Sequence, residues 1–294
     1  MPADSPTPLS HADDFTYPAT PGGLPPQSQR AGGSAIFTEA YAVIPKGVMT
    51  DIVTSFFPAW EGTRAWVLAR PLTGFSETFS HYLMEVAPGG GSEAPEPDSN
   101  AEAVIFITSG AVTLTIDGTA YDMGAGGYAF LPPGCQWTLR AAGDAPAAFH
   151  WVRKHYQAVE GVETPPAFVT SDAEVAPTPM PDCDGKWATT RFVDPGDLRH
   201  DMHVNIVTFR PGGRIPFPET HVMEHGLFIL QGRASYLLNR DWVDVEAGDF
   251  LWLRAFCPQA CDTDAADREP FRYLLYKDVN RHMPLSPGGV MRAR

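Results

Sequence analysis

The stretch Phe106-Ile-Thr-Ser-Gly110 returns as Phe228-Ile-Leu-Gln-Gly232, 122 residues further along the chain. At the same spacing, Gly124-Ala-Gly-Gly-Tyr-Ala-Phe-Leu131 returns as Glu246-Ala-Gly-Asp-Phe-Leu-Trp-Leu253. Similarity at one fixed spacing indicates that a single architectural unit is used twice. The repeat therefore predicts two homologous domains in tandem.

Each unit has the pattern of short β-strands. Residues 111–116 and 234–238 are rich in β-branched, aromatic and other apolar residues, and turn residues follow both of them (Asp117-Gly118 and Asn239-Arg240-Asp241). No segment of 12 or more residues has a 3.6-residue apolar period. The prediction is an all-β protein made of two antiparallel jelly-roll barrels.

Composition sets the expected domain boundaries. Two proline-rich stretches, Thr164-Pro-Pro and 176–185, lie between the repeat units and indicate a connection, whereas both ends of the chain are low in apolar residues. The predicted division is a flexible segment 1–33, a first barrel 34–160, a proline-rich connection 161–189, a second barrel 190–285 and a tail 286–294.

Charge and hydropathy restrict the class of partner. The 294 residues carry a formal charge of −14, which argues against a nucleic-acid partner or an anionic membrane surface. No run approaches the roughly 18 apolar residues that cross a bilayer, and the N-terminus lacks the pattern of a signal peptide. Four cysteines in so long a chain do not form a disulfide framework. We expect a cytoplasmic protein that acts on a small molecule.

The stretch Pro218-Glu-Thr-His-Val-Met-Glu-His-Gly226 concentrates metal-binding residue types. Glu219 and His221 are two apart, so on a strand they point to the same face, and His225 joins them if the strand continues or bends slightly. Gln259 lies on the strand expected to close over this one. A mixed oxygen and imidazole set favours Mn²⁺ or Fe²⁺, with Zn²⁺ and Ni²⁺ still possible. Glu224 alternates away from this face, and we expect it to be solvated or ion-paired.

The first unit serves as an internal control for this motif. Alignment through the repeat places Pro97, Ser99 and Ala103 where the second unit has its carboxylate and two imidazoles, and the counterpart of Gln259 falls at or beside Trp137. None of the three motif positions binds a cation strongly. A one-residue shift would place Glu96, Asp98 and Glu102 there instead, but still no imidazole. We therefore predict one metal ion per chain, held in the second barrel, and a first barrel without metal.

Three segments together resemble one known family. Residues 219–226, 239–249 and 273–281 (Tyr-Leu-Leu-Tyr-Lys-Asp-Val-Asn-Arg) are similar to the (S)-ureidoglycine aminohydrolases, bicupin enzymes of purine and allantoin degradation, and the similarity extends from about residue 34 to 284. The resemblance implies a tandem cupin fold and a Mn²⁺-dependent hydrolase. Such an enzyme would convert a ureide, (S)-ureidoglycine, to (S)-ureidoglycolate and ammonia.

The resemblance also implies roles for particular residues. The family's metal ligands match Glu219, His221, His225 and Gln259, and its substrate-side residues are similar to Tyr236, Tyr273 and Lys277. Glu219 and Lys277 are the expected catalytic residues. Lys277 is the one lysine between residues 187 and 294, so it could receive a substrate carboxylate or donate a proton. The insert 262–267 is a departure from the family that could alter a rim of the site.

Two other functions fit the same residues. Two histidines and one carboxylate also suit an Fe²⁺ oxygenase, although a fourth ligand at Gln259 fills one open position. A cupin that binds a ureide without converting it is the second alternative. We also expect a homo-oligomer, because Phe56, Phe57, Trp60 and Trp66 could be buried against another subunit, although they could equally cover the chain's own barrels.

Overall fold

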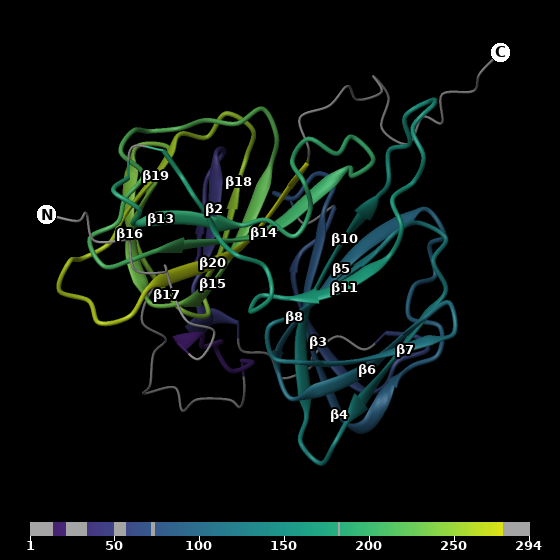
Figure 1. Ribbon diagram of the computed structural model, residues 1–294. Coiled ribbons are helices and arrows are strands. Elements are labelled where there is room, and N and C mark those ends of the chain that lie inside the picture. Colours follow the sequence, from purple (N-terminus) through teal and green to yellow (C-terminus); the bar gives the residue numbers. More distant parts are fainter. Residues whose placement is uncertain (1–13, 22–33, 50–56, 72–73, 182, 279–294) are drawn as a thin grey trace, which may run out of the picture. The chain divides into compact units, whose positions relative to one another are not determined.

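The computed structural model describes residues 14–21, 34–49, 57–71, 74–181 and 183–278. Within these ranges the chain forms β-strands and a 3-10 turn, η2 (Lys46–Val48), and contains no α-helix. The strands of both barrels pair in an antiparallel fashion, as between β4 (Ser80–Ser92) and β10 (Ala147–His155) and between β15 (His225–Gln231) and β18 (Phe250–Leu253). The prediction of an all-β protein with two barrels is confirmed (Figure 1).

The first barrel is formed by one strongly bent sheet. Its strand order is β11-β8-β5-β10-β4-β9-β6-β7, with β3 paired to β4. Buried side chains alternate along the strand at 111–116, as its sequence predicts, so Val112, Leu114 and Ile116 enter the core. The strands are β3 (Glu61–Ala69), β4 (Ser80–Ser92), β5 (Ala101–Ser109), β6 (Ala111–Ile116), β7 (Thr119–Gly124), β8 (Gly127–Leu131), β9 (Trp137–Ala142), β10 (Ala147–His155) and β11 (Phe168–Ser171).

The second barrel has an eight-stranded sheet, β1-β2-β18-β15-β20-β14-β13-β12, and a three-stranded sheet, β17-β16-β19. Its apolar core lies between these sheets and includes Phe209, Leu227 and Leu251. The strands are β1 (Ile36–Phe37), β2 (Tyr41–Ile44), β12 (Thr178–Pro179), β13 (Trp187–Thr190), β14 (Met202–Phe209), β15 (His225–Gln231), β16 (Arg233–Leu238), β17 (Asp241–Glu246), β18 (Phe250–Leu253), β19 (Gln259–Asp262) and β20 (Phe271–Asp278).

The predicted hairpin after residue 116 is present. Asp117 and Gly118 both have positive φ, 46° and 83°, which is the backbone of the two-residue turn that matches the twist of paired strands. The register of the β6–β7 pair runs from Ile116 opposite Thr119 back to Ala111 opposite Gly124. The Asp-Gly dipeptide therefore fixes the pairing of these two strands.

The position of the first strands corrects one predicted boundary. Residues 34–44 were expected to open the first barrel, yet β2 pairs with β18 of the second barrel, with Val43 opposite Leu251. Figure 1 shows this dark purple strand among the green strands of the later sequence. Tyr41–Val43 are buried there, and the Tyr41 hydroxyl donates to Asp241 at 2.8 Å. Burial of an apolar strand, rather than chain order, decides which sheet it joins.

Part of the segment predicted to be flexible is packed. Within residues 14–21, Phe15 lies under the Arg272 guanidinium at 3.6 Å, and the Tyr17 hydroxyl donates to Asp172 at 2.9 Å. Asp172 also pairs with Arg272, which is fully buried. This short stretch covers a buried ion pair, so the prediction of flexibility was wrong for it. The rest of 1–33, and the predicted tail 286–294, lie outside the described residues.

Candidate metal centre

Backbone pairing at one end of the second barrel brings the predicted ligands together. Glu219 and Gln259 form an antiparallel bridge, with N–H···O distances of 2.8 and 2.9 Å in the two directions. His225 begins β15 and lies between Leu253 on β18 and Lys277 on β20. The segment between them is bent rather than extended, so His225 reaches the site after a bend and not on a continuous strand.

The side chains of these residues contact one another. Glu219 Oε1 lies 3.5 Å from His221 Nε2, and the His221 and His225 ring centroids are 4.8 Å apart. Gln259 Nε2 lies 3.1 Å from His225 Nε2. The His221 carbonyl accepts a hydrogen bond from the Phe256 amide at 2.7 Å, which holds the bend. The four predicted ligands are therefore neighbours in one cluster.

The donor chemistry of this cluster fits a divalent cation. His225 Nδ1 lies 3.1 Å from the Met223 carbonyl oxygen, so it acts as the donor and leaves Nε2 with the lone pair that a metal requires. Gln259 Nε2 faces that nitrogen, and a half-turn of the amide would bring Oε1 there and point Nε2 at the Tyr236 hydroxyl, which can accept its hydrogen bond. Nowhere in the described chain do three His, Cys, Asp or Glu side chains already have metal-site geometry. The match between this cluster and a metal site therefore rests on the types of donor atoms and on how close they lie to one another.

Burial keeps the His225 imidazole neutral. Its pKa falls to about 3, chiefly because the ring is desolvated, and the nearby His221 and Lys277 charges lower it further. A neutral imidazole is the form that binds metals. The site therefore has this ligand in the required protonation state at neutral pH.

One tyrosine forms a hydrogen bond with the Gln259 amide, and a second tyrosine lies beside the first. The Tyr236 hydroxyl donates to Gln259 Oε1 at 3.0 Å and lies 3.4 Å from the Tyr273 hydroxyl. Both rings are buried, and burial raises the pKa of each phenol well above its usual value. Both hydroxyls therefore keep their protons, and can donate hydrogen bonds, across the pH range in which proteins are stable.

Lys277 lies next to the ligand cluster on β20. Burial lowers the pKa of its ammonium group, the Glu219 carboxylate raises it, and the positive charge of Arg191 lowers it. Arg191 was not selected from the sequence. It comes directly after β13, far in sequence from the motif at 218–226. The site thus combines the predicted lysine with a second positive charge.

One neighbour of the motif behaves differently from the expectation. Glu224 is buried and accepts a hydrogen bond from the Trp252 indole at 2.8 Å, so the prediction that it is solvated was wrong. Gly226, the last residue of the motif, has no room for a side chain, because a Cβ there would lie 2.1 Å from the Tyr276 ring. Close packing behind His225 therefore fixes the start of β15.

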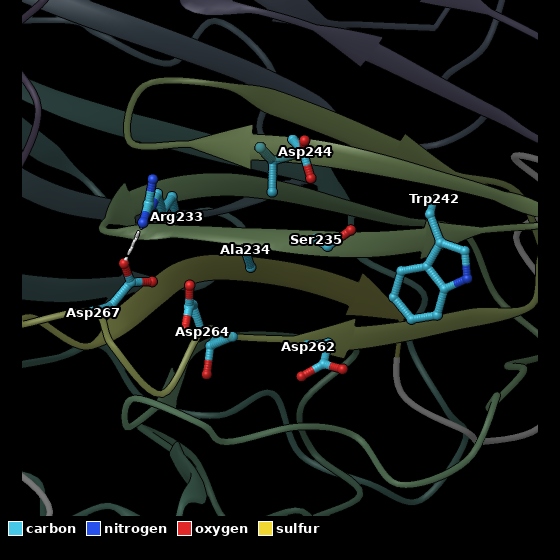
Figure 2. Close-up of a pocket in the computed structure, with 10 residues that line it drawn as sticks. Arg233, Ala234, Ser235, Trp242, Asp244, Asp262, Asp264 and Asp267 are labelled. Atoms are coloured by element: carbon cyan, nitrogen blue, oxygen red, sulfur yellow. Dashed lines mark hydrogen bonds and ion pairs between the residues drawn. The ribbon is translucent and has the colours of Figure 1, made fainter.

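The insert at residues 262–267 lies away from the ligand cluster. It lines a cavity of about 610 Å³ on the three-stranded sheet, together with Trp242 and Asp244 (Figure 2). Asp267 pairs there with Arg233 at 2.7 Å. None of the predicted ligands lines this cavity, so the insert shapes a separate part of the surface.

The first barrel contains the same positions with other side chains. Ala103 lies opposite Leu131 and Arg153 as His225 lies opposite Leu253 and Lys277. Trp137 lies opposite Ile116 as Gln259 lies opposite Leu238. Leu114 likewise corresponds to Tyr236, and Phe149 to Tyr273. The alignment of Ala103 with His225 and of Trp137 with Gln259 is thus reproduced in the strand register.

Comparison with known proteins identifies the family. Residues 82–153 match the cupin domain model. The chain is 32% identical over 232 residues to (S)-ureidoglycine aminohydrolase of Arabidopsis thaliana, covering 78% of this chain and 74% of the relative. It is 29% identical over 241 residues to the Escherichia coli enzyme of the same name, covering 82% and 88%. The chain belongs to the (S)-ureidoglycine aminohydrolase family.

Structural comparison agrees with this assignment to the aminohydrolase family. A crystal structure of a putative glyoxylate-induced protein from Pseudomonas aeruginosa is 60% identical, with a TM-score of 0.85 over 92% of this chain and 98% of that one. The predicted tandem cupin fold is confirmed, since the family, the cupin match and the two barrels agree.

Proposed function

We propose that this protein hydrolyses (S)-ureidoglycine to (S)-ureidoglycolate and ammonia, using one Mn²⁺ ion in the second barrel. The observation that supports this most strongly is the cluster of Glu219, His221, His225 and Gln259 beside Lys277, in a member of the aminohydrolase family. In the net reaction the oxygen of water bonds to the α-carbon, the bond from that carbon to the amino nitrogen breaks, and ammonia leaves with one of water's protons.

The residues of the second barrel supply distinct parts of this chemistry. Glu219, His221, His225 and Gln259 would hold the cation. Bound Mn²⁺ supplies a Lewis acid that polarises the reacting centre. Lys277 offers an ammonium group to the substrate carboxylate, and burial strengthens that contact because little water competes for it. Tyr236 orients the Gln259 amide by a hydrogen bond, and the Tyr273 hydroxyl lies beside that of Tyr236.

Ammonia release from freshly generated (S)-ureidoglycine tests the proposal directly. We expect Mn²⁺ to restore release above the spontaneous rate after the protein is stripped with a chelator. An oxygen electrode run with Fe²⁺ and the same ureide serves as the parallel measurement. Oxygen consumption without ammonia release would favour the oxygenase, and saturable ureide binding without turnover would favour a binding protein.

We further infer that the protein works as a homo-oligomer in the cytoplasm. Trp60 and Trp66 are buried in their own barrel, and Phe57 packs on Tyr82, so these aromatics do not supply the interface; Phe56 lies outside the described residues. The inference therefore rests on the family resemblance and on composition. Light scattering at micromolar concentration would measure the assembly.

No helix in the described ranges is long and apolar enough to cross a membrane.

A further inference from the structure

The first barrel has a small cavity at the positions that hold the ligand cluster in the second. Its volume is about 100 Å³, and its lining includes Ala103 and Trp137, the counterparts of His225 and Gln259. Glu96 enters the same cavity from the preceding segment. The first barrel therefore has a cavity at the positions where the second barrel has its predicted ligands.

Only one of the two Glu96 carboxylate oxygens has hydrogen-bond partners among the residues that the structure describes. Glu96 Oε1 pairs with the Arg153 guanidinium and accepts the Asp98 amide at 2.9 Å. Its Oε2 is buried and makes no hydrogen bond to any residue that the structure describes, and the side chain is 10% exposed. A buried acceptor without a donor costs roughly 1–3 kcal/mol, so such atoms usually have a bound partner.

Arg153 stands at the position of Lys277 and pairs with Glu96, although it does not itself line the cavity. Its guanidinium stacks on Trp151 at 5.1 Å from the ring centroid while it pairs with Glu96. The charge of Glu96 is therefore already compensated, and the partner it lacks is a hydrogen-bond donor rather than a cation. Asp98 at the rim is paired with His155 at 2.5 Å and adds no free acceptor of this kind.

The lining of the cavity combines polar and apolar groups, with Ser99 and Gln136 beside Glu96. The cavity has room for a few waters or for one small organic molecule. Trp137, Leu131 and Pro132 contribute apolar lining. The pKa of Glu96 is raised, chiefly by burial, so a ligand that offers both a donor and an acceptor suits either protonation state.

We propose that this first-barrel cavity binds a small neutral amide of the urea type, with an amide N–H donated to Glu96 Oε2. A urea offers planar N–H donors, which suit the one Glu96 oxygen that has no hydrogen-bond partner among the described residues. That the natural ligand is the ureido group of the substrate or product rests on the proposed function. The proposal that the cavity binds urea compounds does not depend on the proposed function.

Fluorine NMR of protein labelled with 5-fluorotryptophan tests the site, because Trp137 lines it. The chain has seven tryptophans, and Trp137→Phe assigns the resonance. We expect N-methylurea to shift the Trp137 resonance saturably at millimolar concentration. Glu96→Ala should weaken binding at least tenfold, whereas Glu93→Gln, an exposed neighbour paired with Arg140, should not.

The same titration on His225→Ala separates this site from the catalytic one. Binding in the first barrel should persist there, even if the ammonia assay shows no activity in any form of the protein. A Trp137 resonance that does not respond, a response that survives in Glu96→Ala, or a response lost in His225→Ala would overturn the proposal. So would a response to ammonium chloride but not to N-methylurea. If Glu96→Ala does not fold, the wild-type titration and Glu96→Gln, which should bind several-fold more weakly, decide the question.

Discussion

The two barrels share one strand register but fill it with opposite chemistry. In the second barrel, His225 and Gln259 face each other at 3.1 Å, with Tyr236 hydrogen-bonded behind them. In the first barrel, the equivalent interior is aromatic. Trp137 packs edge-on against Trp60 and Trp151, with centroid distances of 6.4 and 5.9 Å. One scaffold thus supports a polar cluster in one copy and an apolar core in the other.

The difference between the two barrel interiors shows which residues of a duplicated fold serve function and which serve stability. Aromatic contacts in the first barrel contribute burial and roughly 0.5–1.5 kcal/mol per ring pair beyond it. The polar groups of the second barrel gain little on burial and must satisfy one another. A site grafted on a stable scaffold therefore depends on a few side chains, whereas the fold depends on many.

The largest expected effect comes from removing an imidazole. His225→Ala should abolish metal retention and lower turnover by roughly 10³-fold or more, because a metal contributes several kcal/mol to the transition state. The matched change in the first barrel, Ala103→His, should add no metal, since the nearby Glu96 and Asp98 carboxylates are already paired with Arg153 and His155. Elemental analysis gives both answers. Two metal equivalents per chain in wild type, with one kept in His225→Ala, would contradict the assignment of metal to one barrel.

The next effect concerns stability rather than chemistry. Trp137→Ala should lower the free energy of unfolding by about 3–5 kcal/mol, because it leaves a cavity among Trp60, Phe149 and Trp151. The metal content of the folded protein should not change. Denaturant unfolding followed beside metal analysis measures both. Loss of metal from folded Trp137→Ala would mean that the two barrels are coupled and that the comparison between them is too simple.

Lys277→Met should follow in size, with a 30- to 1000-fold loss of turnover. Methionine keeps much of the apolar stem but removes the ammonium, and a charge-assisted hydrogen bond in a dry site is worth about 2–4 kcal/mol. A rise mainly in KM assigns Lys277 to the carboxylate, and a fall mainly in kcat assigns it to the transition state. The exposed Lys46, which pairs with Glu246, provides the control variant Lys46→Met. Equal activity of the two variants would place Lys277 outside the site.

Sequence reasoning predicted the fold, and it selected four residues that the structure brings together, because the repeat and the motif at 218–226 can be read directly from the chain. The repeat spacing fixed which residues of the two units correspond, and the register of Ala103 and Trp137 follows it. What it missed depends on contacts between distant segments. No local pattern shows that the strand 41–44 joins the second barrel, that Trp252 satisfies Glu224, or that Arg191 approaches Lys277. These contacts are decided by burial and charge after the chain has folded.

The smallest expected effect comes from changing the residue that orients Gln259, one of the predicted metal ligands. Tyr236→Phe removes the hydroxyl that forms a hydrogen bond with the Gln259 amide, while Leu114, its counterpart in the first barrel, shows that the register tolerates an apolar side chain there. Groups that orient metal ligands typically contribute 10- to 100-fold in affinity. We expect Mn²⁺ affinity to fall by about that factor, with catalysis restored at saturating metal. Tyr273→Phe should do less, because its contact with Tyr236 is longer, 3.4 Å against 3.0 Å. Metal titration by calorimetry compares the two variants. If saturating Mn²⁺ leaves Tyr236→Phe inactive, the hydroxyl acts on the substrate itself, and the polar cluster does more than hold the ion.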